Sequence, residues 1–191
     1  MLGLFAGCQD DQAFSVGPWK MDGQSKSTTT SRAACEDPPD ASDLVQEILG
    51  AVNAQRAHAG VPLLRLDPTL TKVADFYACR LAEDGFFAHE DPFDGSTIDV
   101  RAANFGYPFL KIGENLAAGQ WSVDQVMDDW MASPEHRANI LDPAYTDIGI
   151  VVKLGGDCGT YWVQEFGRPL TPGSISNPTP ANQADESATE K

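Results

Sequence analysis

Apolar residues recur at helical spacing in two stretches of the first half of the chain. In the first, which we expect to form a helix over about residues 42–57, one face carries Leu44, Val45, Ile48, Leu49 and Val52. In the second, Asp67 is placed to cap a helix, Pro68 takes its first position and Gly85 ends it. The apolar face of this helix is continuous and consists of Leu70, Val73, Ala74, Tyr77, Ala78 and Leu81. Two amphipathic helices therefore begin the folded part of the chain.

Three shorter helices are predicted in the middle of the chain. The first covers about residues 97–104. The next begins at Ser122, where Gln125 completes a capping box, and its apolar face carries Val123, Val126, Met127, Trp130 and Met131. Pro134 then begins a short turn of helix that carries His136.

Two segments near the end of the chain alternate in the manner of strands. Residues 148–154 and 161–166 flank the sequence GGDCGT, which predicts a hairpin and hence antiparallel pairing. Apolar residues on both faces of the first segment indicate that both faces of the sheet are covered. The pattern therefore predicts an α+β domain with a small, mainly antiparallel sheet between helical layers.

Changes in composition set the limits of this domain at about residues 41–169. Residues 9–40 are rich in Ser, Thr, Asp, Gly and Pro and are expected to be a disordered linker, and residues 170–191 a disordered acidic tail. Residues 1–8 resemble the end of a truncated bacterial lipoprotein signal, in which Cys8 is lipidated and Gln9 directs the protein to the outer membrane. A chance cysteine after a short apolar run is the alternative, since no basic residues precede it.

The net charge excludes one class of function. With a formal charge of -15 over 191 residues, the chain lacks the basic face that a nucleic-acid-binding protein needs. No segment approaches the roughly 18 continuous apolar residues of a spanning helix. Together with the signal-like residues 1–8, this leads us to expect an exported protein, either an outer-membrane lipoprotein or extracellular. We expect it to contact the membrane only through a lipid anchor.

Two histidines and one glutamate are candidates for chemistry. His89 lies in FFAHEDPFDGST, Glu114 in GENLAAGQWS, where we expect a loop, and His136 in SPEHRANIL. Two imidazoles and a carboxylate suit zinc, but their separations of 25 and 22 residues match no local metal motif. Three unrelated loop residues are the alternative.

The order of these segments resembles the CAP superfamily of cysteine-rich secretory proteins, antigen-5 allergens and plant pathogenesis-related proteins, and in particular its bacterial branch. The resemblance covers about residues 42–167 and rests on FFAH, DG, GEN, WMASPEHRANIL, IGI and YWVQEFG, in that order. It implies a three-layer α-β-α sandwich with a central cleft that holds two histidines and two acidic residues.

The resemblance assigns three of the four cleft residues to His89, His136 and Glu114, with Asn115 beside them. The fourth, an acid three residues after a tryptophan in animal members, is replaced here by a serine. Glu135 is either a substitute carboxylate in the cleft or a solvated surface residue.

Function is predicted with alternatives. The first hypothesis is a monomeric, non-enzymatic binding module at the cell envelope, whose partner is a small apolar ligand, a peptide or an envelope component. Zinc or another divalent metal is an expected cofactor of the cleft but not a required one. The rival hypotheses are a metal-dependent hydrolase that uses His89, Glu114 and His136, and a purely structural envelope protein. No Ser or Cys is tied by motif to a histidine base, which favours the module.

The four cysteines predict one disulfide inside the domain. Cys79 lies late in the second helix and off its apolar face, so core packing does not explain it. A short connection makes the first two helices roughly antiparallel, and Cys35 precedes the first helix by only a few residues. We therefore expect Cys35 to pair with Cys79 and Cys158 to be left free.

Overall fold

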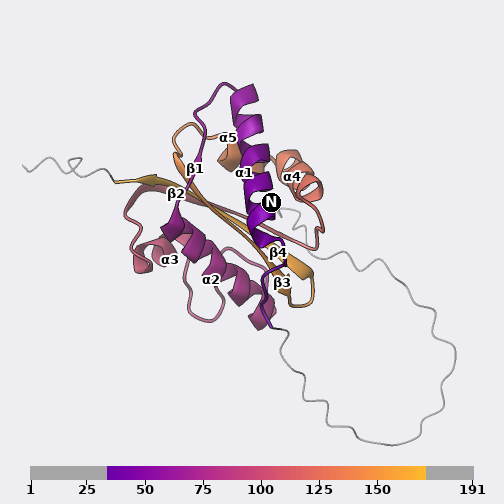
Figure 1. The fold of residues 1–191 in the computed structure, drawn as a ribbon. Coiled ribbons are helices and arrows are strands. Elements are labelled where there is room, and N and C mark those ends of the chain that lie inside the picture. Colours follow the sequence, from indigo (N-terminus) through magenta and orange to yellow (C-terminus); the bar gives the residue numbers. More distant parts are fainter. Residues whose placement is uncertain (1–33, 171–191) are drawn as a thin grey trace, which may run out of the picture.

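The computed structural model describes residues 34–170 of the chain, and the predictions for residues 1–33 and 171–191, including lipidation of Cys8, lie outside them (Figure 1). In these described residues four strands form one sheet, and five helices cover its two faces. This is the predicted three-layer α-β-α sandwich. In chain order they are α1 (Ala41–His58), β1 (Arg65–Leu66), α2 (Pro68–Asp84), α3 (Ile98–Asn104), β2 (Phe109–Ala118), α4 (Val123–Ala132), α5 (Pro134–Leu141), β3 (Asp147–Gly155) and β4 (Gly159–Pro169).

Helices α1, α4 and α5 cover one face of the sheet. Their apolar sides bury one large cluster that includes Ile48, Val52, Trp130 and Ile140, and they pack on Trp162 of β4. Each fully buried aliphatic side chain of this kind stabilises the fold by about 1.5–3 kcal/mol. The helical spacing seen in the sequence is thus explained by burial against the sheet.

Helices α2 and α3 cover the opposite face (Figure 1). Asp67 caps α2, with one carboxylate oxygen accepting from the backbone N–H groups of Thr69 and Leu70. The first turn of α2 lies directly on β3, because a Cβ at Gly149 would collide with the backbone of Leu70. A glycine in β3 therefore lets α2 approach the sheet closely enough to close this layer.

The sheet has the order β1-β3-β4-β2, so β2 is an edge strand. β3 pairs antiparallel with β4, and β4 with β2, while β1 adds a short parallel pairing with β3. The expectation of a loop around Glu114 is wrong, because residues 109–118 form β2. Local sequence hid this strand, since its glycine and polar residues face the interior of the molecule rather than alternating between core and solvent.

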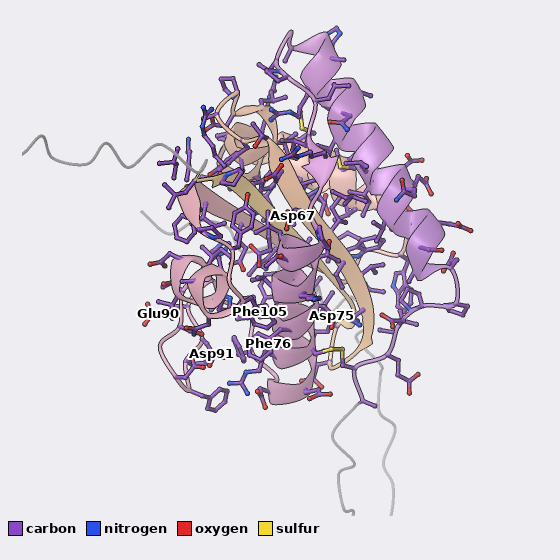
Figure 2. All side chains as sticks on the ribbon, turned by 60° about the vertical axis from the view of Figure 1, so that its left-hand side comes forward. Asp67, Asp75, Phe76, Glu90, Asp91 and Phe105 are labelled. Atoms are coloured by element: carbon purple, nitrogen blue, oxygen red, sulfur yellow. A yellow bond between two sulfur atoms is a disulfide. The ribbon has the colours of Figure 1, made fainter. Side chains whose placement is uncertain are left out.

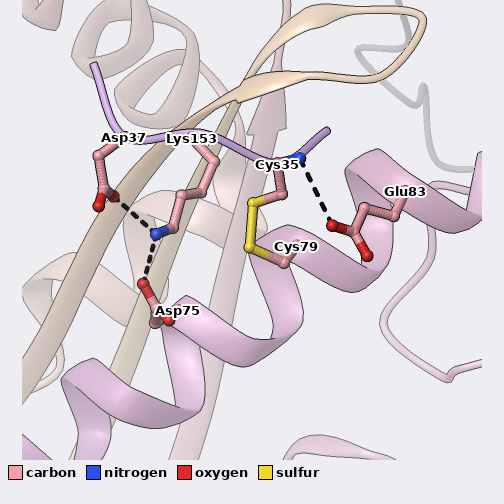
Figure 3. The surroundings of a disulfide bond; sticks show 6 residues. All are labelled: Cys35, Asp37, Asp75, Cys79, Glu83 and Lys153. Carbon is pink, nitrogen blue, oxygen red and sulfur yellow. Dashed lines mark hydrogen bonds and ion pairs between the residues drawn. A yellow bond between two sulfur atoms is a disulfide. The ribbon is translucent and has the colours of Figure 1, made fainter. Parts of the chain in front are cut away.

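The segment of residues 34–40 ahead of α1 is attached to the domain, although its composition suggested a linker (Figure 3). Cys35 and Cys79 form the predicted disulfide, with their Cα atoms 5.2 Å apart. Glu36 exchanges two backbone hydrogen bonds with Leu154 of β3. The buried Lys153 ammonium lies 2.6 Å from a carboxylate oxygen of Asp37 and 2.6 Å from one of Asp75. These contacts hold the segment against α2 and β3.

Cys158 is not free, so that expectation is wrong. It is disulfide-bonded, and its partner is neither Cys35 nor Cys79, which are joined to each other. The error came from assigning Cys8 to a lipid, which left an odd number of thiols. Within the described residues no helix is long and apolar enough to cross a membrane.

Candidate functional site

Glu114 is the centre of the predicted site. It lies on the edge strand β2, its side chain is buried, and both carboxylate oxygens have partners. One oxygen is 2.7 Å from Nδ1 of His89, and the other is 2.5 Å from the guanidinium of Arg101. The guanidinium of Arg101 makes its hydrogen bond to Glu114 charge-assisted, and the two carboxylate oxygens together join His89 to Arg101.

Arg101 was not foreseen from the sequence, and it organises the site. It projects from α3, is buried, and donates to the backbone carbonyls of His89 and Ser96 as well as to Glu114. The carbon of its guanidinium lies 3.3 Å from the ring centroid of Tyr77, so the cation also stacks on an aromatic face. Arg101 thereby ties α2, α3, β2 and the loop that carries His89 to one another.

His89 is presented to solvent by this arrangement. It lies in the loop after α2, and its side chain is 55% exposed. Because ionised Glu114 can only accept, Nδ1 of His89 carries the proton of this hydrogen bond. In the neutral ring Nε2 is then left as an acceptor that faces away from Glu114.

His136 approaches from the other helical layer, on α5. Its backbone carbonyl accepts from Nδ2 of Asn115, and Nδ2 of Asn139 donates to the backbone carbonyl of Glu114, so two amides join α5 to β2. Burial, followed by the nearby His89, lowers the pKa of His136. The ring is therefore mainly neutral at pH 7, and it lies near enough to His89 for the charge of that ring to affect it.

The other predicted cleft residues lie near His136 in different settings. Asn115 is buried and hydrogen-bonds with Gln164 and Asn139. Glu135 is exposed on the first turn of α5, close enough for its charge to partly oppose the lowering of the pKa of His136. We refer to His89, Arg101, Glu114 and His136 together as the histidine site.

A second carboxyl group lies beneath the site and was also missed. Glu165 of β4 is the cross-strand partner of Glu114, and it is fully buried. Neither of its oxygens has a hydrogen-bond partner of normal geometry among the described residues. Burial, and then the charge of Glu114, raise the pKa of Glu165 well above its usual range. The folded protein therefore favours the protonated form of Glu165 more than the unfolded chain does. The sequence YWVQEFG contained a signal for this burial. Glu165 lies two residues after Val163, so in a strand both side chains face the same side, and Val163 faces the core.

The side chains of the histidine site offer few free ligands for a metal ion. Among residues 34–170, no group of three or more His, Cys, Asp and Glu side chains is arranged to hold a metal ion. The oxygens of Glu114 already bind His89 and Arg101, so this carboxylate orients a histidine instead of offering a lone pair to a metal. The residues do not fit a zinc centre with three or four protein ligands, and the site offers two imidazole rings.

Neither histidine of the site is hydrogen-bonded to a nucleophilic side chain among the described residues. Within the described part of the chain, no Ser, Thr or Cys side chain hydrogen-bonds to His89 or His136. A histidine base activates a nucleophile within hydrogen-bond reach of about 2.6–3.2 Å or through one bridging water. The arrangement presents two imidazoles at the surface but couples neither to a nucleophilic side chain.

Comparisons with known proteins agree with the fold and with the order of the segments. Residues 49–166 match the family model of CAP, the cysteine-rich secretory protein family. The chain is 33% identical over 141 residues to the uncharacterized protein YkwD of Bacillus subtilis, a match that spans 74% of this chain and 52% of that protein. It thus spans about half the length of this relative.

Two solved structures are similar to the domain. An outer surface protein of Borrelia burgdorferi is 25% identical with a TM-score of 0.62, over 67% of this chain and 94% of that one. An extracellular protein with an SCP domain from Bacillus anthracis is 26% identical with a TM-score of 0.60, over 69% of this chain and 44% of that one.

Proposed function

The chain belongs to the CAP (cysteine-rich secretory protein) family, and from this membership we propose that it is an exported, non-enzymatic binding module of the cell envelope. The observation that carries the proposal is the exposed His89, whose Nδ1 is held by a buried carboxylate that is itself held by Arg101. Such an arrangement fixes the direction in which a ring nitrogen faces, which is what a binding site needs.

Export is supported by two kinds of observation. The disulfide between Cys35 and Cys79, together with the bonded Cys158, suits an oxidising compartment outside the cytosol. The names of the two similar structures describe an outer surface protein and an extracellular protein. The outer-membrane or extracellular location is a further part of the proposal, whereas a lipid on Cys8 would require Cys158 to pair with a cysteine outside this chain, because the chain has four cysteines.

The ligand of the histidine site is proposed to bind by accepting and donating hydrogen bonds at the two imidazoles. A peptide backbone or a small molecule with a polar group meets this requirement. A divalent metal would be held by His89 through Nε2 and by His136, with water at the remaining positions, and therefore weakly. Zinc bound in this way would supply Lewis acidity, but the proposed function does not use it.

The rival hypothesis, a metal-dependent hydrolase, needs a third protein ligand and an aligned water or nucleophile. The engagement of both Glu114 oxygens argues against it. A purely structural role does not explain why a buried arginine and carboxylate are used to orient an exposed histidine.

Titration of the metal-free protein with zinc chloride, followed by NMR of the histidine side chains, tests the site. We expect weak binding that shifts His89 and His136 together and that is lost in His89→Ala and in His136→Ala. His58→Ala is the matched control, since His58 is exposed at the end of α1, away from the site. Loss of orientation in Glu114→Gln should weaken binding by about 10–100-fold. Binding that survives in both site variants would refute the site.

Turnover of a fluorogenic peptide and a fluorogenic ester tests the claim that the module is non-enzymatic. We expect rates for the wild type equal to those for His136→Ala, with and without a chelator. A rate that depends on His136 and falls with the chelator would establish the hydrolase and overturn the proposal. Mass spectrometry of protein purified gently from envelopes would then identify the class of bound ligand.

A further inference from the structure

Two aromatic side chains lie together on the outer surface of α2 and α3, and the packing of the domain does not account for them. Phe76 points outward from α2, away from the face that covers the sheet, and Phe105 follows the last residue of α3. Their ring centroids are 5.5 Å apart, and each residue is 39% exposed. Figure 2 shows the pair side by side on one face of the molecule. Val100 of α3 adds a further exposed apolar side chain.

A hollow adjoins this pair along the chain. It has a volume of about 360 Å³ and is lined by Ala103, Gly106, Tyr107, Pro108 and Phe109, the residues on either side of Phe105. We call Phe76, Val100, Phe105 and this hollow the α2–α3 surface. Exposed apolar side chains scattered singly need no explanation, but two aromatic side chains exposed together on one surface are typical of an interaction site.

The α2–α3 surface has acidic surroundings. Residues 67–105 contain eight Asp or Glu and only three Lys or Arg. Two of these three cations, Arg80 and Arg101, bind carboxylates within the domain, which leaves Lys72 as the exposed cation of this stretch. Figure 2 shows Asp67, Asp75 and the exposed Glu90 around the two phenylalanines, while the nearby Asp91 is buried and bound to Arg80.

We propose that the α2–α3 surface binds a basic segment of a partner protein, with an apolar side chain against Phe76 and Phe105 and lysine or arginine side chains toward the carboxylates around them. The charge of the surroundings selects this partner. An acidic segment or an anionic membrane would be repelled by them, and by the net charge of -15 on the whole chain. Basic side chains would also gain from the exposed aromatic faces, which attract cations. The proposal uses none of the four residues of the histidine site, so it does not rest on that site.

Calorimetric titration with a synthetic amphipathic peptide of Leu, Phe and Lys tests the proposal. We expect binding by the wild type that weakens as salt is raised from about 0.05 M to about 0.5 M, because screening shortens the range of the charges. The same peptide with every Lys replaced by Glu should not bind. Absence of binding by the Lys peptide would overturn the proposal.

Variants locate the peptide. Phe76→Ser combined with Phe105→Ser should weaken binding at least about 30-fold, the loss that corresponds to one interaction hot spot. Leu63→Ser combined with Trp121→Ser is the matched control. These two apolar side chains lie outside α2 and α3 and are 59% and 70% exposed, which is more than Phe76 and Phe105. Equal weakening in both pairs would refute the location.

Two further measurements keep the result decisive. Glu90→Lys changes an exposed charge without touching the core, so it should weaken peptide binding even if the double phenylalanine variant folds poorly. Sedimentation of the wild type, without peptide, tests whether a second copy of the chain is the natural occupant. Dimerisation that is abolished by the phenylalanine substitutions would replace the proposed basic partner with the protein itself.

Discussion

Replacing Cys35 and Cys79 together by serine should lower the free energy of unfolding by about 4 kcal/mol. The two cysteines are 44 residues apart in the sequence. A cross-link over a loop of this length removes about 13 cal/mol/K of entropy from the unfolded chain, which is about 4 kcal/mol at 25 °C. For a domain of this size we expect the melting temperature to fall by roughly 10–20 °C.

The loss should also be visible locally, because the remaining contacts of residues 34–37 are weak. The ion pair between Lys153 and Asp37 involves an exposed carboxylate and contributes about 0–1 kcal/mol. The two backbone hydrogen bonds of Glu36 contribute about 1 kcal/mol each. Fixing the backbone of each of these residues costs about 1–2 kcal/mol, so without the disulfide the segment should detach. The Leu154 amide, which donates to Glu36, should then exchange faster with solvent.

Urea unfolding under non-reducing conditions, with hydrogen exchange at Leu154, measures both effects. The double variant is preferable to a single one, since a lone thiol would attack the disulfide of Cys158. Reduction of the wild type is the comparison, because it breaks the Cys158 bond as well and should destabilise further. A loss below about 1 kcal/mol with unchanged exchange at Leu154 would refute the chain-entropy reasoning.

Three further predictions concern buried charge and the N-terminal cysteine. Glu165→Gln should be more stable than the wild type at pH 8 but not at pH 4, by up to about 1.4 kcal/mol per pH unit in between. Because the pKa of Glu165 is raised in the folded protein, the folded wild type keeps a proton that the unfolded chain releases, and its stability falls as pH rises. Parallel plots of unfolding free energy against pH for the two proteins, measured in urea, would contradict this. Arg101→Met should destabilise by about 3–5 kcal/mol, because it leaves Glu114 buried without its cation. Arg101→Lys should restore part of the loss, and calorimetry that shows no change for either variant would remove Arg101 from its assigned role. Peptide mapping should find Cys158 in a disulfide, and a Cys8 partner would exclude lipidation, because both modifications consume the same sulfur atom.

The helices could be predicted from the sequence because burial on one side leaves a period that is visible locally. Leu70, Val73 and Tyr77 are all fully buried in α2, as their spacing indicated. Strand β2 could not be predicted in this way, since its middle carries the site. There Glu114 and Asn115 take interior positions on opposite faces of the strand that apolar residues would ordinarily fill.

Some residues of the candidate site could be found from the sequence and others could not. His89 and His136 were found because histidine is rare in this chain and the surrounding segments resemble a family. Arg101 and Glu165 were missed because a charged residue in a helix or strand is ordinarily solvated. Only the tertiary structure shows that Arg101 lies on Tyr77 and that Glu165 is opposite Glu114.

The attachment of Cys35 to α2 has a mechanical consequence. A tension applied to the chain ahead of Cys35 enters the domain at Cys79 through a covalent bond, not by peeling Glu36 from β3. Because α2 packs along β3 and β4, the pull must shear a whole helix across the sheet, which loads many contacts at once instead of one after another. Glu114 lies on the strand at the opposite edge of the sheet from β1. Because Arg101 lies on Tyr77 of α2 and also binds Glu114, the same pull would reach the carboxylate that orients His89.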